Sequence, residues 1–161
     1  MNDIFNRVEL LAGREGLERL RQARVIIFGL GGVGSWAAES LARTAIGHIT
    51  LVDADDVAPT NINRQLPALL STVGQPKVDI IARRIADINP QCEVVTRRER
   101  YTAETAESFD IRSFDYCIDA IDSVADKAAL IVEATSQTRP RLFSSMGAAL
   151  RCDPTRVTTA E

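Results

Sequence analysis

The amino-acid sequence predicts an α/β protein with a Rossmann-like, doubly wound, mainly parallel sheet that carries helices on both faces. Three observations support this prediction. Short apolar, β-branched runs alternate with segments of helical period, which is the order of βαβ units. A glycine-rich turn directly follows the first apolar run, and acidic residues directly follow the second and the fourth. Because parallel strands joined by right-handed crossovers point the same way, these polar segments should meet at one edge of the sheet.

The first βαβ unit begins with a strand at residues 25–28, continues with a helix at residues 35–45 and ends with a strand at residues 49–52. Four glycines lie between the first strand and the helix: Gly29, Gly31, Gly32 and Gly34. They permit a sharp turn and leave no Cβ atom between the backbone and a bound phosphate. The positive end of the following helix would face that phosphate. A tight turn without a ligand is the alternative, but four glycines are more than a bare turn requires.

The glycine turn predicts a nucleotide without saying which one. Gly29, Gly31 and Gly34 satisfy G-x-G-x-x-G, and Asp53 follows the second strand roughly 20 residues later, where a carboxylate can accept hydrogen bonds from ribose hydroxyls. The spacing of Gly29 and Gly34 also fits a P-loop, but Ser35 stands where that motif needs lysine. Any cation for a triphosphate must therefore come from elsewhere in the chain.

The remaining elements follow the same alternation. A surface helix at residues 14–22 leads into the first strand, and a polar loop at residues 54–65 leaves the second strand. The later elements are a helix from Pro76 to about Asn89, a strand at 93–96, a short helix at 102–109, a strand at 114–120, a helix at 127–136 and a strand at 141–146. The sequence stops in what is predicted to be another strand or loop, so we expect residues 1–161 to form one domain that is truncated on its C-terminal side.

Composition places few limits on function. The 161 residues are 45% hydrophobic with a net charge of −3, which predicts a folded domain without a general attraction to nucleic acid or membrane. No apolar run approaches the ~20 residues that span a bilayer, and no signal peptide is evident, so a cytoplasmic protein is expected. Cys92, Cys117 and Cys152 form no C-x-x-C pair. Cys117 is predicted to be a core residue, and we expect no zinc in this segment.

Five polar residues should collect at the carboxyl edge of the predicted sheet: Asp53, Asn61, Arg64, Lys77 and Asp122. They would supply a ribose acceptor, an amide, two cations for phosphates and a carboxylate able to hold Mg²⁺. Lys77 begins a helix, where a cation is unfavourable unless an anion binds nearby, although an exposed lysine is the commoner explanation. A dinucleotide oxidoreductase would not need this set, whereas magnesium-assisted chemistry on a nucleoside triphosphate would.

Five motifs in this order and spacing resemble the E1-like (ThiF-type) ubiquitin-activating superfamily. They are Gly29-Leu30-Gly31-Gly32-Val33-Gly34-Ser35, Asp53-Ala54-Asp55, Asn61-Ile62-Asn63-Arg64-Gln65, Gly74-Gln75-Pro76-Lys77 and Asp119-Ala120-Ile121-Asp122. The resemblance extends from about Phe5 to the end of the chain. The superfamily includes the adenylating enzymes of molybdopterin and thiamine biosynthesis.

The resemblance implies ATP as the nucleotide and adenylation of a carboxylate as the reaction. Asp53 would hold the ribose, and Asp55 is counted with it among the nucleotide-binding residues. Asn61, Arg64 and Lys77 would contact the phosphates, while Asp122 would coordinate Mg²⁺. The resemblance further implies a homodimer, because Arg7 falls where the superfamily has an arginine that reaches the partner subunit's triphosphate. The implied catalytic residues are Arg64, Lys77, Asp122 and Arg7.

Within the superfamily the sequence is most similar to the tRNA threonylcarbamoyladenosine dehydratases, as seen in residues 34–43, 118–131 and 153–155. The subgroup implies a ligase-like, ATP-dependent tRNA modification that cyclises this nucleoside. A related alternative is adenylation of the C-terminal glycine of a ubiquitin-like sulfur-carrier protein, with a sulfur-relay partner. Two further alternatives are a dinucleotide oxidoreductase module and a fragment that binds ATP and dimerises without turnover.

Overall fold

Five parallel strands form one sheet in the part of the chain that the structure describes. The computed structural model describes residues 4–136, 138–147 and 153–160. The strands are β1 (Arg24–Phe28), β2 (His48–Val52), β3 (Glu93–Arg97), β4 (Tyr116–Asp119) and β5 (Arg141–Ser144), in the spatial order β3-β2-β1-β4-β5. All four strand pairs are parallel. The strand order reverses at β1, which creates a switch point at the carboxyl end of β1, where such sheets bind ligands.

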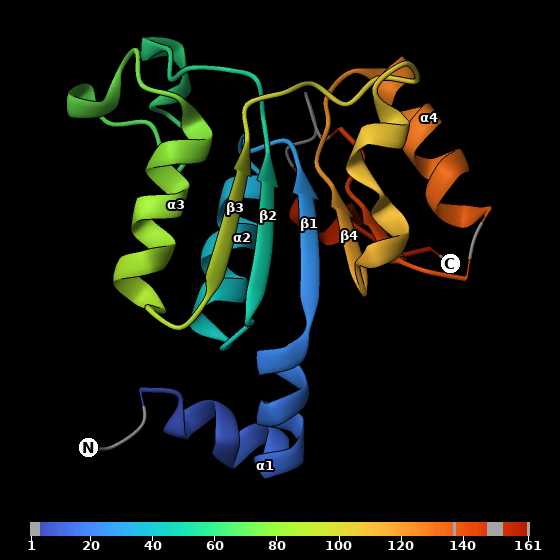
Figure 1. Cartoon of the computed structure of the whole chain (residues 1–161). Coiled ribbons are helices and arrows are strands. Elements are labelled where there is room, and N and C mark those ends of the chain that lie inside the picture. The colour runs from blue at the N-terminus through green and yellow to red at the C-terminus, as the bar shows by residue number, and fades with distance from the viewer. Residues whose placement is uncertain (1–3, 137, 148–152, 161) are drawn as a thin grey trace.

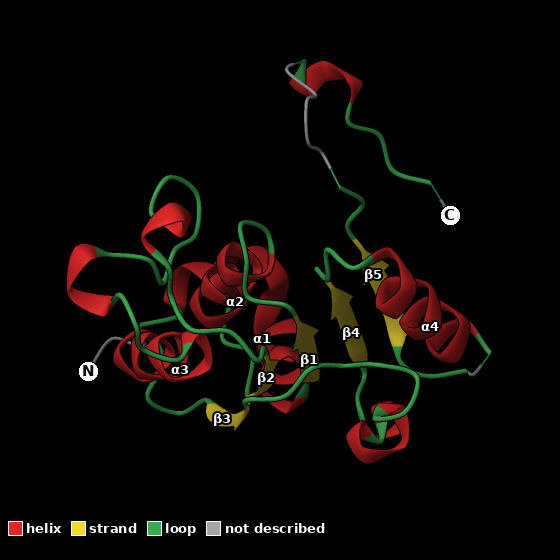
Figure 2. Ribbon diagram, turned by 90° about the horizontal axis from the view of Figure 1, so that it is seen from above, coloured by secondary structure: helices red, strands yellow, loops and turns green. Residues whose placement is uncertain are grey.

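Helices cover both faces of the sheet, which confirms the predicted doubly wound α/β class. Figure 2 shows α2 (Gly34–Arg43) and α3 (Lys77–Ile88) on one side of the row of strands and α4 (Val124–Thr135) on the other. The helix α1 (Asn6–Gln22) lies beyond the amino ends of the strands, opposite the end to which the strand arrows point (Figure 1). Short 3₁₀ turns lie at Pro59–Asn61, Leu70–Thr72, Ala106–Phe109, Ile111–Ser113 and Pro154–Arg156.

Two hydrophobic cores follow from the alternation of side chains along β1. Val25 and Ile27 point to one face and pack in the core that α2 and α3 complete, whereas Ile26 and Phe28 belong to the core under α4. In this second core the ring of Phe28 meets those of Tyr101 and Phe109 edge-on, at centroid distances of 5.0 and 5.2 Å. Cys117 is fully buried there, as predicted. Both faces are therefore packed, and the edges of the sheet remain for function.

The predicted helix at residues 102–109 was wrong, because this segment contains turns and only one 3₁₀ stretch, Ala106–Phe109. Thr102 and Thr105 exchange side-chain-to-backbone hydrogen bonds, which compete with a regular helix. The first helix begins at Asn6 instead of Arg14 and is interrupted at Gly13, which has φ of 74°. Burial of Phe5 and Leu17 against Ala45 supports this earlier start.

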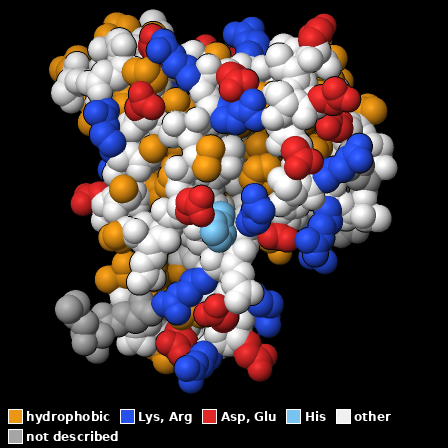
Figure 3. All heavy atoms as spheres, in the orientation of Figure 1, with side chains coloured by type: hydrophobic (Ala, Val, Ile, Leu, Met, Phe, Trp, Pro, Cys, Tyr) orange, Lys and Arg blue, Asp and Glu red, His pale blue; other side chains and the backbone are white. Residues whose placement is uncertain are grey.

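The charged side chains on the face seen in Figure 3 are mixed in sign, and no large patch of one charge is evident on that face. No helix within the described ranges is both long enough and apolar enough to cross a membrane.

A buried carboxylate joins α2 to α3. Glu39 accepts hydrogen bonds from Arg43 at 2.6 and 2.9 Å and from Arg84 Nη2 at 2.9 Å, and its side chain is nearly inaccessible to water. These guanidinium groups, Arg84 foremost, hold the pKa of Glu39 below its ordinary value of 4.5. Because the native pKa is lowered, the stabilisation is complete above pH 4.5 and is lost as the pH falls through the native pKa.

Replacing Glu39 by glutamine is expected to lower the free energy of unfolding by about 1 to 2 kcal/mol at pH 7, because charge-assisted hydrogen bonds are lost. The difference from the unaltered protein should shrink below pH 4.5, because Glu39 of the unfolded chain then takes up a proton while Glu39 of the native protein is still ionised. Urea denaturation at pH 7 and at pH 3.5 measures this, with Glu18→Gln as a control because Glu18 makes an exposed contact to Gln22. An equal difference at both pH values would contradict the account.

Candidate nucleotide-binding site

The glycine turn joins β1 to α2 at the carboxyl edge of the sheet. Gly29 has φ of 87°, and a Cβ atom on it would lie 2.7 Å from the carbonyl oxygen of Ala120. A Cβ atom on Gly34 would overlap the carbonyl oxygen of Gly29. The packing of the turn itself therefore requires two of the four glycines. Gly31 and Gly32 have no such requirement, since Cβ atoms there would meet no atom closer than 3.5 Å.

The first turn of α2 leaves backbone donors available. The helical hydrogen bonds begin with the N–H of Ser35, which donates to the carbonyl of Gly31 at 3.2 Å. Within the described ranges, the N–H groups of Gly32, Val33 and Gly34 have no protein acceptor. Open N–H groups at the positive end of a helix are suited to an anion, and the absence of Cβ atoms on Gly31 and Gly32 leaves room for its close approach.

Asp53 shapes the neighbouring loop. Its Oδ2 accepts the N–H of Leu30 at 2.6 Å and its Oδ1 accepts the N–H of Asp55 at 2.8 Å, so the carboxylate fastens the glycine turn to the end of β2. A ribose hydroxyl can bind Asp53 only in addition to these two donors. The side chain of Asp55 is 60% exposed, which makes it the more accessible of the two carboxylates.

Lys77 is buried, which excludes the exposed surface lysine that the sequence left open. It is 4% exposed, and its Nζ donates to Oδ2 of Asp55 at 2.9 Å and lies 3.9 Å from Oδ1 of Asp53. A buried ammonium beside two carboxylates needs no further anion for neutrality. It is nevertheless held at the first turn of α3, directly beside the loop that follows β2.

The polar loop carries Arg64 to the glycine turn. The aliphatic carbons of Arg64 would lie 3.5 and 3.6 Å from a Cβ atom on Gly32, so its side chain passes over the open part of the turn. Its Nη1 donates to the carbonyl of Thr60 at 3.1 Å and to Oδ1 of Asn63 at 2.9 Å. Asn61 uses its Oδ1 to accept the N–H of Ala58 at 3.0 Å, which leaves its amide donors available. A cationic side chain therefore lies beside the open part of the turn.

A second buried pair supports the opposite side of the turn. Asp119 at the end of β4 is fully buried and accepts hydrogen bonds from Lys127 at 2.7 Å and Ser144 at 2.6 Å. Its Oδ1 also accepts the N–H of Ile121 at 3.0 Å, which shapes the segment leading to Asp122. Sequence reasoning gave no role to Asp119 or Lys127. One sequence signal could have indicated this pair. A strand that ends in an acidic residue is followed by a helix with a lysine in its first turn, and the same pattern relates Asp53 to Lys77.

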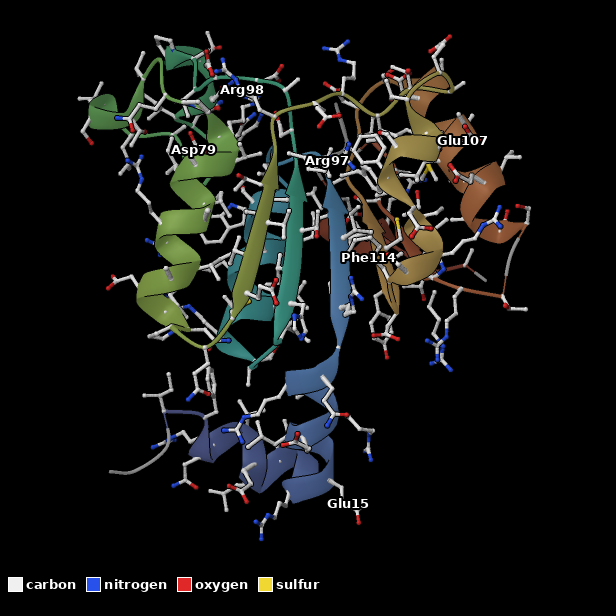
Figure 4. All side chains as sticks on the ribbon, in the orientation of Figure 1. Glu15, Asp79, Arg97, Arg98, Glu107 and Phe114 are labelled. Atoms are coloured by element: carbon white, nitrogen blue, oxygen red, sulfur yellow. The ribbon has the colours of Figure 1, made fainter. Side chains whose placement is uncertain are left out.

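Asp122 and Arg7 are exposed, and the structure places them differently. Asp122 follows β4 at the same edge as the glycine turn, and none of the hydrogen bonds within the described ranges involves its side chain. Arg7 lies in α1 beyond the opposite end of the sheet, so it is not brought together with the other predicted residues of the same chain. Figure 4 illustrates the separation: Asp79 of α3 and Arg98 after β3 lie at the carboxyl end, and Glu15 of α1 lies at the other.

The donor set fits Mg²⁺ brought by phosphates better than a metal held by protein alone. Among the residues described, no group of three or more His, Cys, Asp or Glu side chains could hold a metal ion. Mg²⁺ is usually bound through one or two carboxylates together with substrate phosphates. The exposed carboxylate of Asp122, at the same edge of the sheet as the glycine turn, is compatible with that arrangement.

The two cysteines that the structure describes are not suited to nucleophilic chemistry. Burial raises the pKa of the Cys117 thiol to about 12 and that of Cys92 to about 11. Both are therefore protonated at neutral pH, and a thiol is a poor nucleophile. Cys152 lies outside the described residues.

Comparison with known proteins agrees with this geometry. A profile described as the ThiF family matches residues 5–161. The tRNA threonylcarbamoyladenosine dehydratase of Bacillus subtilis (strain 168) is 55% identical over 157 residues, which are 98% of this chain and 61% of that protein. The molybdopterin-synthase adenylyltransferase of Salmonella typhimurium (strain LT2) is 34% identical over 92% of this chain and 59% of its own length.

A solved structure is also similar. The crystal structure of E. coli tRNA N6-threonylcarbamoyladenosine dehydratase in complex with ATP superposes with a TM-score of 0.90 at 44% identity, covering 94% of this chain and 62% of that one. The chain thus spans about three fifths of the length of the relatives it matches. The chain belongs to the ThiF family, the E1-like family that its five motifs predict.

Proposed function

We propose that this protein binds ATP at the glycine turn and transfers AMP to a substrate carboxylate. The observation that carries the proposal is that three features share one edge of the sheet: the open N–H groups on α2, the Arg64 side chain over Gly32, and the Lys77 ammonium beside Asp53 and Asp55. Such a set is suited to a polyphosphate and to the charge that develops when its α-phosphorus is attacked. The ATP complex of the E. coli relative supports the choice of nucleotide.

The site residues receive the roles that their positions support. The N–H groups of the turn at Gly31, Gly32 and Gly34, the amide of Asn61, and the side chains of Arg64 and Lys77 hold the phosphates. The ribose lies against Asp55 and Asp53. The carboxylate of Asp53 also continues to accept the N–H groups of Leu30 and Asp55. Asp122 would hold Mg²⁺, which would supply charge neutralisation at the phosphates. Gly29 and Gly34 also keep the turn in shape.

Arg7 completes the site from a second copy of the chain. Within one chain it lies beyond the opposite end of the sheet, which leaves a role in the partner's site as the one that fits the family resemblance. We therefore propose a homodimer, with Arg7 of each protomer directed to the triphosphate of the other.

The proposed substrate is the carboxylate of a threonylcarbamoyl group on adenosine in tRNA, as the names of the B. subtilis and E. coli relatives suggest. A carboxylate oxygen attacks the α-phosphorus as the bond to the β-phosphate breaks and pyrophosphate leaves. The carbamoyl group of the same nucleoside then attacks the activated carbonyl, loses its proton and expels AMP. The closure needs no protein nucleophile, consistent with the raised thiol pKa values of Cys92 and Cys117. A tRNA-modifying enzyme of this kind would work in the cytoplasm.

The second candidate function is adenylation of the C-terminal glycine of a ubiquitin-like sulfur carrier, with a sulfur-relay partner. The similarity to the molybdopterin-synthase adenylyltransferase favours it, because the same ATP site would serve both carboxylates.

The substrate is tested by incubating the protein with ATP, Mg²⁺ and tRNA that carries threonylcarbamoyladenosine, followed by nucleoside analysis with mass spectrometry. We expect a nucleoside lighter by one water, formed only when ATP is present. Unchanged tRNA, with AMP transferred instead to a ubiquitin-like carrier, would contradict the tRNA assignment and support the second candidate.

Replacing Asp122 by asparagine is expected to raise the Mg²⁺ concentration needed for half-maximal activity by about 10-fold or more, since a neutral amide is a weaker ligand for a hard cation. A Mg²⁺ titration of AMP formation measures this. Asp126→Asn, four residues along the chain, is the matched control and should leave the titration unchanged. An unaltered titration for Asp122→Asn would contradict a metal role for Asp122.

A further inference from the structure

Trp36 connects the glycine turn to the loop that carries Arg64. It is the one tryptophan of the sequence and lies in the first turn of α2. Its indole Nε1 donates to the backbone carbonyl of Arg64 at 3.2 Å, across 28 positions of sequence. Yet the side chain is 54% exposed, so burial in the core does not explain its place. The hydrogen bond to the loop is the specific contact of this side chain.

Ser35 makes a second connection from the adjacent position. It is fully buried, its Oγ donates to the carbonyl of Gly31 at 2.6 Å, and the same Oγ accepts the N–H of Leu66 at 3.3 Å. Two successive residues of α2 therefore hold the backbone on both sides of Gln65. This is what the serine does at the position where a P-loop would have its lysine.

The two connections hold the backbone from which the Arg64 side chain extends. The loop has only a three-residue 3₁₀ turn of its own, Pro59–Asn61, and the Arg64 side chain is exposed. Its aliphatic carbons nevertheless pass over Gly32, the open part of the turn. A cation stabilises developing phosphate charge only when it is already in position, because a mobile side chain must first lose conformational freedom.

We infer that Trp36 is a positioning residue, which holds the backbone of Arg64 so that its guanidinium stands ready for the phosphates of ATP. The inference rests on the proposed function and adds to it a residue that does not itself contact the nucleotide. Because Trp36 is half-exposed, loss of its N–H donor should affect the site more than the stability of the fold.

Equilibrium binding of labelled ATP with Mg²⁺ tests this through a double-mutant cycle of Trp36→Phe and Arg64→Ala. Phenylalanine keeps an aromatic ring but lacks the donor. We expect Trp36→Phe to weaken ATP binding about 5- to 10-fold, the usual effect of one hydrogen bond. In the Arg64→Ala background the same substitution should have no further effect. Thr44→Ala, at the exposed residue that follows α2, is the control and should bind as the unaltered protein does, because its hydroxyl donates to the carbonyl of Leu41 and does not contact Trp36.

Fluorescence gives a readout that a purely structural role would not move. Since Trp36 is the sole tryptophan, the indole emission of the unaltered protein should change on ATP titration and saturate together with ATP binding. At saturating ATP that change should be largely absent from Arg64→Ala, because without the Arg64 side chain the bound phosphates no longer contact the loop that Trp36 holds.

Three results would overturn the inference. The first is that Trp36→Phe weakens ATP binding equally with and without Arg64. The second is that Trp36→Phe does not weaken ATP binding in the otherwise unaltered protein. The third is that the indole emission does not change when ATP binds. If the unaltered protein binds no ATP at all, the proposed function fails, and the inference fails with it.

Discussion

Replacing Lys77 by alanine is expected to lower the rate of AMP formation about 100-fold or more, the typical cost of removing one preorganised donor to developing charge. Lys77 is buried at the first turn of α3 and is held 2.9 Å from Asp55. It is therefore fixed before ATP arrives and need not be ordered during the reaction. The effect should appear in kcat, since an interaction strengthened in the transition state is lost.

The measurement is steady-state AMP release, with thermal unfolding in parallel to separate catalysis from folding. Arg83→Ala is the matched control, because Arg83 is an exposed cation on the same helix that contacts Gln75. It should retain normal activity. Near-normal adenylation by a folded Lys77→Ala protein would contradict the role of Lys77.

Replacing Gly34 by alanine is expected to destabilise the protein by more than about 3 kcal/mol, an effect at the upper end of overpacking. The added Cβ would overlap the carbonyl oxygen of Gly29 and lie 3.1 Å from Cβ of Ala120. Backbone atoms of the turn cannot move aside as the end of a flexible side chain can. The turn between β1 and α2 must therefore open, and both hydrophobic cores lie directly beneath it.

Chemical denaturation measures this change. Gly32→Ala is the comparison within the same turn. Its Cβ would meet no atom closer than 3.5 Å, and the nearest are side-chain carbons of Arg64, so this substitution should cost less than about 1 kcal/mol. Equal stability of the two variants would show that the close approach at Gly34 does not constrain the turn.

Much of the fold could be predicted from sequence because its signals are local. Apolar runs such as residues 25–28 and 49–52 are short and β-branched, and the helix later found at Lys77–Ile88 has a clear apolar period. The errors arose where local signals compete. Around Thr102 and Thr105, side-chain hydrogen bonds replaced the predicted helix. The early start of α1 depends on Phe5 reaching Ala45, a contact that no local pattern encodes.

The edge at which the site lies could also be predicted, since strand ends fix it, but the connections within the site could not. Sequence placed Arg64 and the glycines at one edge, and the structure brings Arg64 over Gly32. It did not reveal that Asp53 fastens the glycine turn, or that Trp36 holds the loop of Arg64. These are hydrogen bonds across more than 20 residues, which depend on the final path of the backbone. The same holds for the pair of Asp119 and Lys127, whose burial becomes visible only when β4 and β5 are adjacent.

The central claim is that this site transfers AMP to a carboxylate on modified tRNA. The most direct measurement is release of AMP from α-labelled ATP in the presence of Mg²⁺ and the protein. Reactions with tRNA that carries threonylcarbamoyladenosine are compared with reactions containing the same tRNA without that modification. The account predicts AMP only with the modified tRNA, and none when Arg64 and Lys77 are both replaced by alanine. AMP release that does not depend on the modification, or that persists in the double variant, would contradict it.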